Sequence, residues 1–385
     1  MTEGEIDYEG TSLSDSTLKW ANVLVRFLSG LFPLRPIKAV NVGLGGTGSE
    51  YGAVRFARDV LSHNPDLVLI EFSCNDCPEC DEDCNEKGKA YRQIYLESMI
   101  RQCMEMEKVP AIIYMHVPVP YEGEAMWRYQ MGRSFKQEVL DHYGIGTVDA
   151  MADMMAEYEA QKAITPELTL TEFYKVYYEQ YENGSFNVHP YASGYLLFAM
   201  SLIHALVHTP EQYFRPFQMK DALYCKDDVA AVCERYKYIP ASSERISYKG
   251  DWTLYTAEHP YESEDPSRLI RPSRLTRSHQ FPDGLMQTER SMGSAFEFDS
   301  EADRICMPHV SARAGLGAKV YANGVQVGQT SCYSIWHGMN YTGEWISLPK
   351  GEKRIRFVVE DPSEAATVFR FGYIVEAFDK QVGEL

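Results

Sequence analysis

Hydrophobic positions in the first part of the chain follow two different periods. Between residues 53 and 61 they fall three or four positions apart, the spacing of one buried face of a helix. These positions are Ala53, Phe56, Ala57, Val60 and Leu61. Residues 67–72 and 111–117 are almost continuous apolar runs instead, typical of strands buried on both faces of a sheet. Because helical and strand patterns alternate up to about residue 220, the sequence predicts an α/β domain with a mostly parallel sheet.

The same patterns predict the other elements of this domain. Asp15 or Ser16 can cap a helix with the apolar face Trp20, Val23, Leu24, Phe27 and Leu28. Residues 37–42 and 145–148 predict short strands, and residues 90–106 predict a long helix. Residues 194–207 are apolar but too short to span a bilayer and are interrupted by Ser201 and His204, so they predict a core helix.

From about residue 252 the pattern changes to short alternating runs separated by Gly, Asn, Ser and Thr. Asn323-Gly324 lies between two such runs, which is the strongest short signal for a β-hairpin. Residues 345–348 and 355–359 predict a strand on each side of a turn, and residues 368–377 predict another strand. We therefore expect an α/β domain over 1–220, a linker over 221–250, and a jelly-roll-like β-sandwich over 251–385.

Three short segments of the first domain carry candidate chemistry. Residues 41–49, Asn-Val-Gly-Leu-Gly-Gly-Thr-Gly-Ser, follow a predicted strand, and their glycines let backbone N–H groups approach a ligand. Ser73-Cys74-Asn75-Asp76 ends the next strand, and His189-Pro190 precedes a predicted helix. Taken singly, each has a structural explanation: a glycine-rich turn, an Asn-Asp turn, or a structural histidine.

Together, the three segments resemble the conserved blocks of SGNH (GDSL-type) hydrolases over roughly residues 1–210. The resemblance implies a flavodoxin-like, three-layer α/β/α domain. It also implies that Gly46 and Asn75 supply the oxyanion hole and that His189 is the general base. Phe186 stands where the family usually has an Asp, so the resemblance implies a Ser-His dyad or a carboxylate from elsewhere.

The nucleophilic serine of the family is absent from this sequence. Met1-Thr2-Glu3-Gly4 matches the tail of the family's first block, so we expect the serine just before Met1. The internal candidates Ser12, Ser14 and Ser16 lie past that block, and Ser16 is better explained as a helix cap.

The resulting hypothesis is a serine esterase that removes an acyl group, such as acetyl, from a carbohydrate without a cofactor. The 385-residue chain is 45% hydrophobic, enough for two domains with sizeable cores. Its formal charge of −18 argues against nucleic acid and anionic membranes as partners, and the oligomeric state stays open. The main alternative is a non-catalytic glycan-binding protein. Its sugar platform would use Trp252, Trp336 and Trp345, although core packing explains these side chains equally well.

The cysteines offer a less favoured alternative, a metal protein. Cys74, Cys77, Cys80 and Cys84 have the spacing of a ferredoxin cluster run, and zinc is also compatible with them. A metal there would crowd the expected oxyanion hole, so free thiols or one local disulfide are favoured. The odd total of 9 cysteines favours a reducing, cytoplasmic compartment, with a signal peptide upstream of Met1 as an open alternative.

Overall fold

The chain forms two compact units. The computed structural model describes residues 19–44, 47–76, 86–120, 123–208, 210–213, 220–225, 236–256, 283, 285–289, 293–310, 315–332, 340–341, 345–360 and 368–378. The first unit comprises residues Met1–Ser49 and Val60–Tyr224, and the second comprises Glu50–Asp59 and Cys225–Leu385. In the part of the chain that the structure describes, no helix combines the length and the apolar character needed to cross a bilayer.

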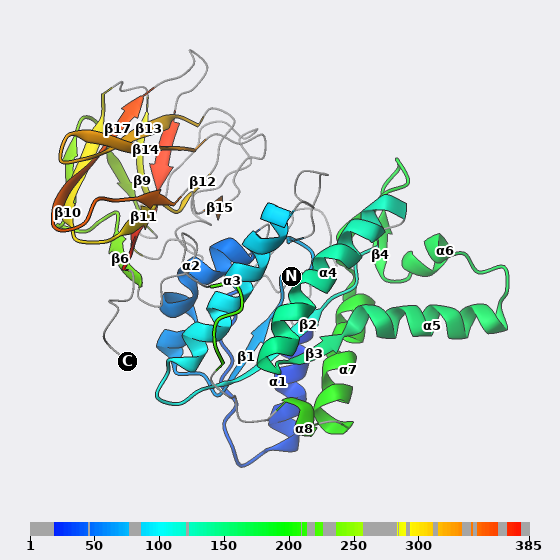
Figure 1. The fold of residues 1–385 in the computed structure, drawn as a ribbon. Helices are drawn as coiled ribbons and strands as arrows, with labels where there is room; N and C mark the ends of the chain where they lie inside the picture. Colours follow the sequence, from blue (N-terminus) through cyan, green and yellow to red (C-terminus); the bar gives the residue numbers. More distant parts are fainter. Residues whose placement is uncertain are drawn as a thin grey trace. The chain divides into compact units, whose positions relative to one another are not determined.

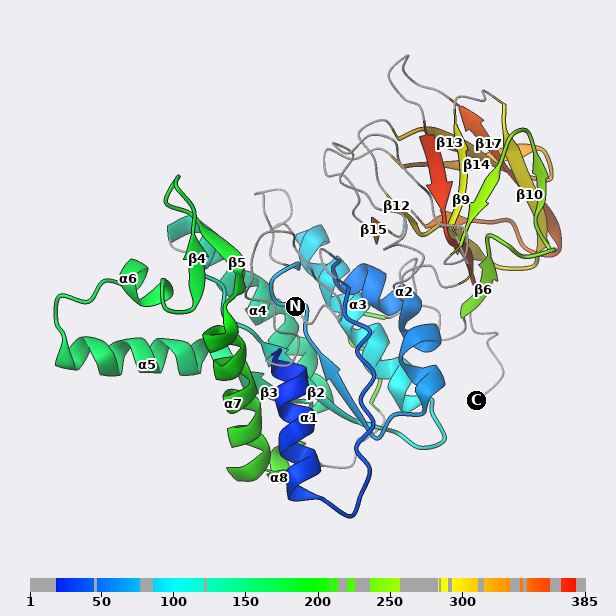
Figure 2. The same cartoon turned by 180° about the vertical axis from the view of Figure 1, so that it is seen from behind.

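The first unit is built on a parallel sheet with helices on both faces (Figures 1 and 2). Its described strands lie in the order β1 (Leu67–Ile70), β2 (Ala111–His116) and β3 (Gly146–Asp149). Helices α1 (Trp20–Leu31) and α7 (Ala192–His208) pack together on one face, where apolar side chains of both meet those of β2 and β3. Helices α3 (Glu86–Met104) and α4 (Gly123–Tyr143) lie side by side on the other face. This arrangement is the expected three-layer α/β/α architecture.

The remaining elements of the first unit follow β3. Helix α5 (Ala150–Ile164) begins where Asp149 Oδ1 accepts a hydrogen bond from Ala152 N at 2.9 Å. Helix α6 (Leu170–Tyr174) has a capping box made by Thr169 and Glu172, and a hairpin of β4 (Tyr178–Gln180) and β5 (Phe186–Pro190) comes next. The short helix α8 (Pro210–Tyr213) follows α7. An aromatic cluster holds this region together, comprising Met154, Tyr158, Phe173, Tyr174 and Tyr178.

Two details differ from the sequence-based expectation. Residues 37–42 form no strand, none of the described strand pairings includes them, and Val40 is 40% exposed. Helix α1 begins at Trp20 with Lys19 as an N-cap that makes no side-chain cap bond. The expected caps Asp15 and Ser16 lie outside the described residues.

The second unit is an antiparallel β-sandwich. One sheet has the order β14-β13-β17-β10-β7, with bounds β7 (Ser247–Lys249), β10 (Ala295–Ser300), β13 (Gly317–Ala322), β14 (Val325–Ser331) and β17 (Lys353–Glu360). A second has the order β16-β11-β19-β6, with bounds β6 (Tyr236–Pro240), β11 (Arg304–Cys306), β16 (Ile346–Ser347) and β19 (Tyr373–Ala377). A third has the order β15-β12-β18-β9-β8, with bounds β8 (Thr253–Tyr255), β9 (Leu285–Glu289), β12 (His309–Val310), β15 (Asn340–Tyr341) and β18 (Val368–Phe371).

An aromatic stack forms the centre of the sandwich core. Phe296 of β10 stacks on Phe357 of β17 and on Phe371 of β18, with ring centroids 4.5 Å apart in both pairs. The stack therefore joins side chains of different sheets, which is how the inner faces of a sandwich interdigitate. One buried cluster contains these rings and apolar residues from all three sheets.

The sandwich confirms the expected hairpin and changes other boundaries. Asn323 and Gly324 have φ values of 49° and 83° between β13 and β14, as a type I′ turn requires. Strands β6 and β7 fall inside the expected linker 221–250, so much of that segment belongs to the sandwich. Strands β16 and β17 lie in different sheets, and the single strand expected over 368–377 divides at Gly372 into β18 and β19.

Helix α2 (Ser49–Asp59) was expected to bury one stripe, but it is buried almost all round. Its residues from Glu50 onward belong to the second unit, although they directly follow the glycine-rich segment in the sequence.

Candidate functional site

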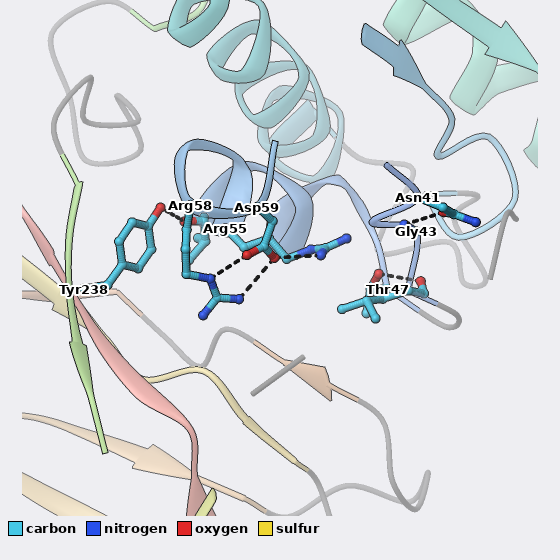
Figure 3. Close-up of polar contacts among 9 residues, drawn as sticks. Asn41, Gly43, Thr47, Arg55, Arg58, Asp59 and Tyr238 are labelled. Carbon is cyan, nitrogen blue, oxygen red and sulfur yellow. Dashed lines mark hydrogen bonds and ion pairs between the residues drawn. The ribbon is translucent and has the colours of Figure 1, made fainter. Parts of the chain in front are cut away.

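The described residues of the glycine-rich segment, 41–44 and 47–49, include two hydrogen bonds made by its own polar side chains (Figure 3). Asn41 Oδ1 accepts a hydrogen bond from Gly43 N at 3.0 Å, and the Thr47 hydroxyl donates to Leu44 O at 2.8 Å. Gly46, the expected backbone donor of the oxyanion hole, lies outside the described residues, so its role stays a prediction.

Asn75 lies beside this loop. It belongs to a turn after β1 that is closed by a hydrogen bond from Asp76 N to Phe72 O at 3.0 Å. Its side-chain Nδ2 donates to Thr47 O at 3.0 Å, so the structure brings two of the three sequence segments together. A carboxamide nitrogen carries two hydrogens, and the contact with Thr47 uses one of them.

Asp76 makes a second link between the same two segments, one that sequence reasoning missed. Its Oδ1 accepts a hydrogen bond from Ser49 N, the first residue of α2, at 2.7 Å. Its Oδ2 lies 3.4 Å from Lys136 Nζ of α4, and the two side chains are 4% and 1% exposed. A Cβ atom on Gly48 would lie only 2.8 Å from Asp76 Oδ1, so glycine is needed there for the carboxylate to approach. No sequence pattern pairs Asp76 with Lys136, because the two lie on different elements.

Ser73 joins the end of β1 to the end of β2. Its hydroxyl donates to Glu71 Oε1 at 2.6 Å and accepts a hydrogen bond from Val117 N at 3.1 Å. The Ser73 side chain therefore cross-links the ends of the two strands.

His189 lies on β5, in a hairpin attached to the carboxyl end of β2. Tyr178 of β4 pairs with Pro190, and its buried hydroxyl donates to Pro118 O at 2.9 Å. Pro118 follows Val117, the residue bonded to Ser73, so a continuous series of contacts leads from the Asn75 turn to the His189 hairpin. Both therefore lie at the carboxyl edge of the parallel sheet, where ligands bind in open α/β folds.

The environment of His189 keeps its imidazole neutral. Burial, assisted by the positive charge of Lys19, lowers the pKa of His189 to about 4. The ring is therefore in its proton-accepting form at neutral pH, as a general base requires. Its backbone N–H donates to Asn187 Oδ1 at 3.0 Å. Phe186 stands where the resemblance implies an Asp. Its ring packs against the ring of Tyr174, with the two ring centroids 5.7 Å apart.

Cys74, the one cysteine of the run that the structure describes, lies among apolar side chains. Cys74 packs beside the buried residues Val119 and Met151. Cys77, Cys80 and Cys84 lie outside the described residues, so the proposed run of four is not tested. Among the residues that the structure does describe, no group of three or more His, Cys, Asp and Glu side chains could hold a metal ion.

The tryptophans proposed as a sugar platform pack against other aromatic rings. Trp252 meets Phe296, Phe369 and Phe371 at nearly right angles, at the edge of the sandwich core. Trp345 stacks on Tyr236 with ring centroids 5.9 Å apart. These contacts favour the core-packing explanation for both side chains, and Trp336 lies outside the described residues.

Comparison with solved structures identifies proteins that have a similar fold. No protein-family model matches the chain, and no curated protein matches it significantly. Among solved structures, a two-domain esterase active on acetylated mannans, co-crystallised with mannopentaose, matches with a TM-score of 0.62. The alignment covers 97% of this chain and 88% of that one at 17% identity. The chain shares this two-domain fold.

Two further structures complete the comparison. A second structure of the two-domain mannan esterase matches with a TM-score of 0.60 at 15% identity, covering 96% of this chain and 88% of that one. The acetylxylan esterase Axe2 from Geobacillus stearothermophilus matches 48% of this chain and 80% of its own at 21% identity, with a TM-score of 0.36.

Proposed function

We propose that this chain is an SGNH-type serine esterase that removes acyl groups, acetyl in particular, from a carbohydrate. The observation that carries the proposal is the hydrogen bond from Asn75 Nδ2 to Thr47 O, because it unites the two segments expected to form an oxyanion hole. The contacts that attach the His189 hairpin to the same edge of the sheet support it further. The fold shared with an esterase of acetylated mannans suggests the substrate class by analogy alone.

In this proposal the chemistry follows the two steps of acyl transfer. A serine hydroxyl, expected just before Met1, attacks the ester carbonyl while His189 accepts its proton. The negative charge that develops on the carbonyl oxygen is stabilised by the second amide hydrogen of Asn75 and the backbone N–H of Gly46. The protonated His189 then donates its proton to the sugar oxygen as the carbon–oxygen bond breaks, so the sugar leaves with a free hydroxyl. In the second step His189 activates a water, which releases the acid and restores the serine.

The direct test is acetate release from acetylated manno-oligosaccharides by a version of the chain extended upstream to include the serine block. We expect Asn75→Ala to lower kcat about 100- to 1,000-fold with little change in KM, since an oxyanion donor acts mainly in the transition state. His189→Ala should lower activity by at least as much. The exposed His204→Ala on α7 is the matched control and should leave the activity unchanged.

The same preparation separates the proposal from the glycan-binding alternative. Calorimetric titration with an unacetylated manno-oligosaccharide measures binding without chemistry. Binding accompanied by no acetate release would favour a non-catalytic glycan-binding protein. Activity that survives His189→Ala would remove the proposed base.

A further inference from the structure

We infer that the β-sandwich positions the oxyanion loop by holding helix α2, with Arg58 and Tyr238 as positioning residues. The inference deepens the proposed function, on which its catalytic meaning rests. It concerns a helix that starts at Ser49, directly after the glycine-rich loop, and continues from Glu50 as part of the second unit. Three kinds of contact, apolar, hydrogen-bonding and cation–π, carry the inference.

The first contact is apolar. Val54, in the middle of α2, is fully buried and packs in a cluster with four side chains of the sandwich. These are Leu285, Cys306, Tyr373 and Val375. Burying the apolar Val54 side chain stabilises the packing of α2 against the sandwich. The helix therefore supplies part of the second unit's hydrophobic core.

The second contact is a hydrogen bond to the helix backbone. The hydroxyl of Tyr238 on β6 donates to Val54 O at 2.7 Å (Figure 3). A carbonyl carries two lone pairs, so Val54 O can accept this bond in addition to a bond within the helix. This bond fixes the position of α2 along its own axis relative to strand β6, in addition to the apolar packing of Val54.

The third contact is a cation–π contact between Arg58 of α2 and two tyrosine rings of the sandwich, with the guanidinium oriented by an ion pair inside α2. The Arg58 guanidinium lies 4.3 Å from the centroid of the Tyr373 ring and 5.8 Å from that of Tyr238. Asp59 holds it through bonds of 2.6 Å from Nε and 3.1 Å from NH2, and also accepts a bond of 2.9 Å from Arg55 (Figure 3). A planar guanidinium held in this way over an aromatic face has one preferred orientation.

The start of α2 transmits this anchoring to the proposed site. Ser49 N donates to Asp76, and Thr47 O accepts the side-chain amide of Asn75. A helix of 11 residues is rigid over its length, so a shift or rotation of its sandwich-facing side moves Ser49 and the residues before it. The sandwich would thus act on the Asn75 amide through α2 and the Thr47 carbonyl.

Hydrogen–deuterium exchange of the full chain tests the anchoring independently of any enzyme activity. Tyr238→Phe removes only the hydroxyl, and Arg58→Ala removes the guanidinium. Each should speed exchange of the amides of 47–59 about five- to ten-fold, the effect of losing one hydrogen bond, while α7 is unchanged. Arg354→Ala is the matched control, because Arg354 pairs with Asp299 and Glu297 on the exposed surface of the same sandwich.

The Asn75 side-chain amide provides a second readout. In protein labelled with 15N-asparagine, its resonance is identified by its loss in Asn75→Ala. It should shift in Tyr238→Phe and Arg58→Ala and stay in place in Arg354→Ala. Unchanged exchange over 47–59, uniformly faster exchange over the whole chain, or an unmoved Asn75 resonance would each overturn the inference. An inactive extended chain would overturn the proposed function while leaving these measurements valid.

Discussion

Replacement of Asp76 by Asn tests the central link of the candidate site. Asn has the shape of Asp but carries no charge. In the structure, the Asp76 carboxylate accepts Ser49 N at 2.7 Å and faces Lys136 Nζ at 3.4 Å, with both side chains almost fully buried. Lys136 Nζ has one other described contact, a 3.3 Å hydrogen bond to Phe72 O. Asp76→Asn therefore leaves a buried ammonium group facing a neutral amide.

The magnitude follows from the desolvation of that charge. Removing one partner of a buried ion pair destabilises a protein by about 3–5 kcal/mol, because the other charge remains out of water. Lys136→Met should cost less, since Ser49 N still donates to the remaining Asp76 carboxylate. The double variant contains no buried charge at this position and should lose less than the sum of the two single changes. We expect this coupling to be about 2 kcal/mol or more.

The assay is a double-mutant cycle on the free energy of unfolding of the first unit. Hydrogen exchange into β2 and α4, followed as urea is raised, separates that unit from the sandwich. Strictly additive losses, or an Asp76→Asn loss below about 1 kcal/mol, would mean that Asp76 and Lys136 do not form a coupled buried pair. The same result would remove the argument that Asp76 holds the start of α2.

Three other changes give defined outcomes. Gly48→Ala places a Cβ atom 2.8 Å from Asp76 Oδ1 and should lower the urea midpoint by a destabilisation of about 1–3 kcal/mol, whereas Gly30→Ala, with open space around it, should not. Burial lowers the pKa of His309 to about 4, so its neutral form stabilises the sandwich above pH 6.5, and about 3 kcal/mol is lost as the pH falls to about 4. Thermal unfolding from pH 7 to 4 should show a smaller loss for His309→Gln, and an equal loss would contradict this assignment. Phe296→Ala removes the ring shared by two stacked pairs and should cost about 3–5 kcal/mol of sandwich stability in urea, with a loss under about 1 kcal/mol counting against the stack.

Local patterns in the sequence predicted the elements that depend on local physics. The type I′ turn at Asn323-Gly324 follows from two residues that tolerate positive φ, and strand β2 follows from a run of apolar side chains. The position of Asn75 at the end of β1 was predictable for the same reason, since a polar turn ends a buried run.

Features that depend on distant partners could not be predicted in this way. Residues 37–42 have the composition of a strand but form none, and no pairing among the described strands includes them. Lys136 has no local signal as the partner of Asp76, since α4 brings it there. Of the predicted stripe, Ala53 and Phe56 are buried on α2, whereas Val60 and Leu61 lie past its end and are half-buried. Val54 of α2 packs against strands that come much later in the chain.

The position of α2 in the second unit has a consequence for how the chain folds during synthesis. The helix leaves the ribosome early, while β19, which carries Tyr373 and Val375, comes close to the end of the described sequence. Until that strand is made, Val54 and Arg58 have no surface to pack against. Contacts between such distant residues form slowly, and an exposed apolar helix face favours aggregation in the meantime. Helix α2 should therefore stay without its core partners until the sandwich strands are made, and a nascent chain halted before residue 225 should be a preferred target for chaperones.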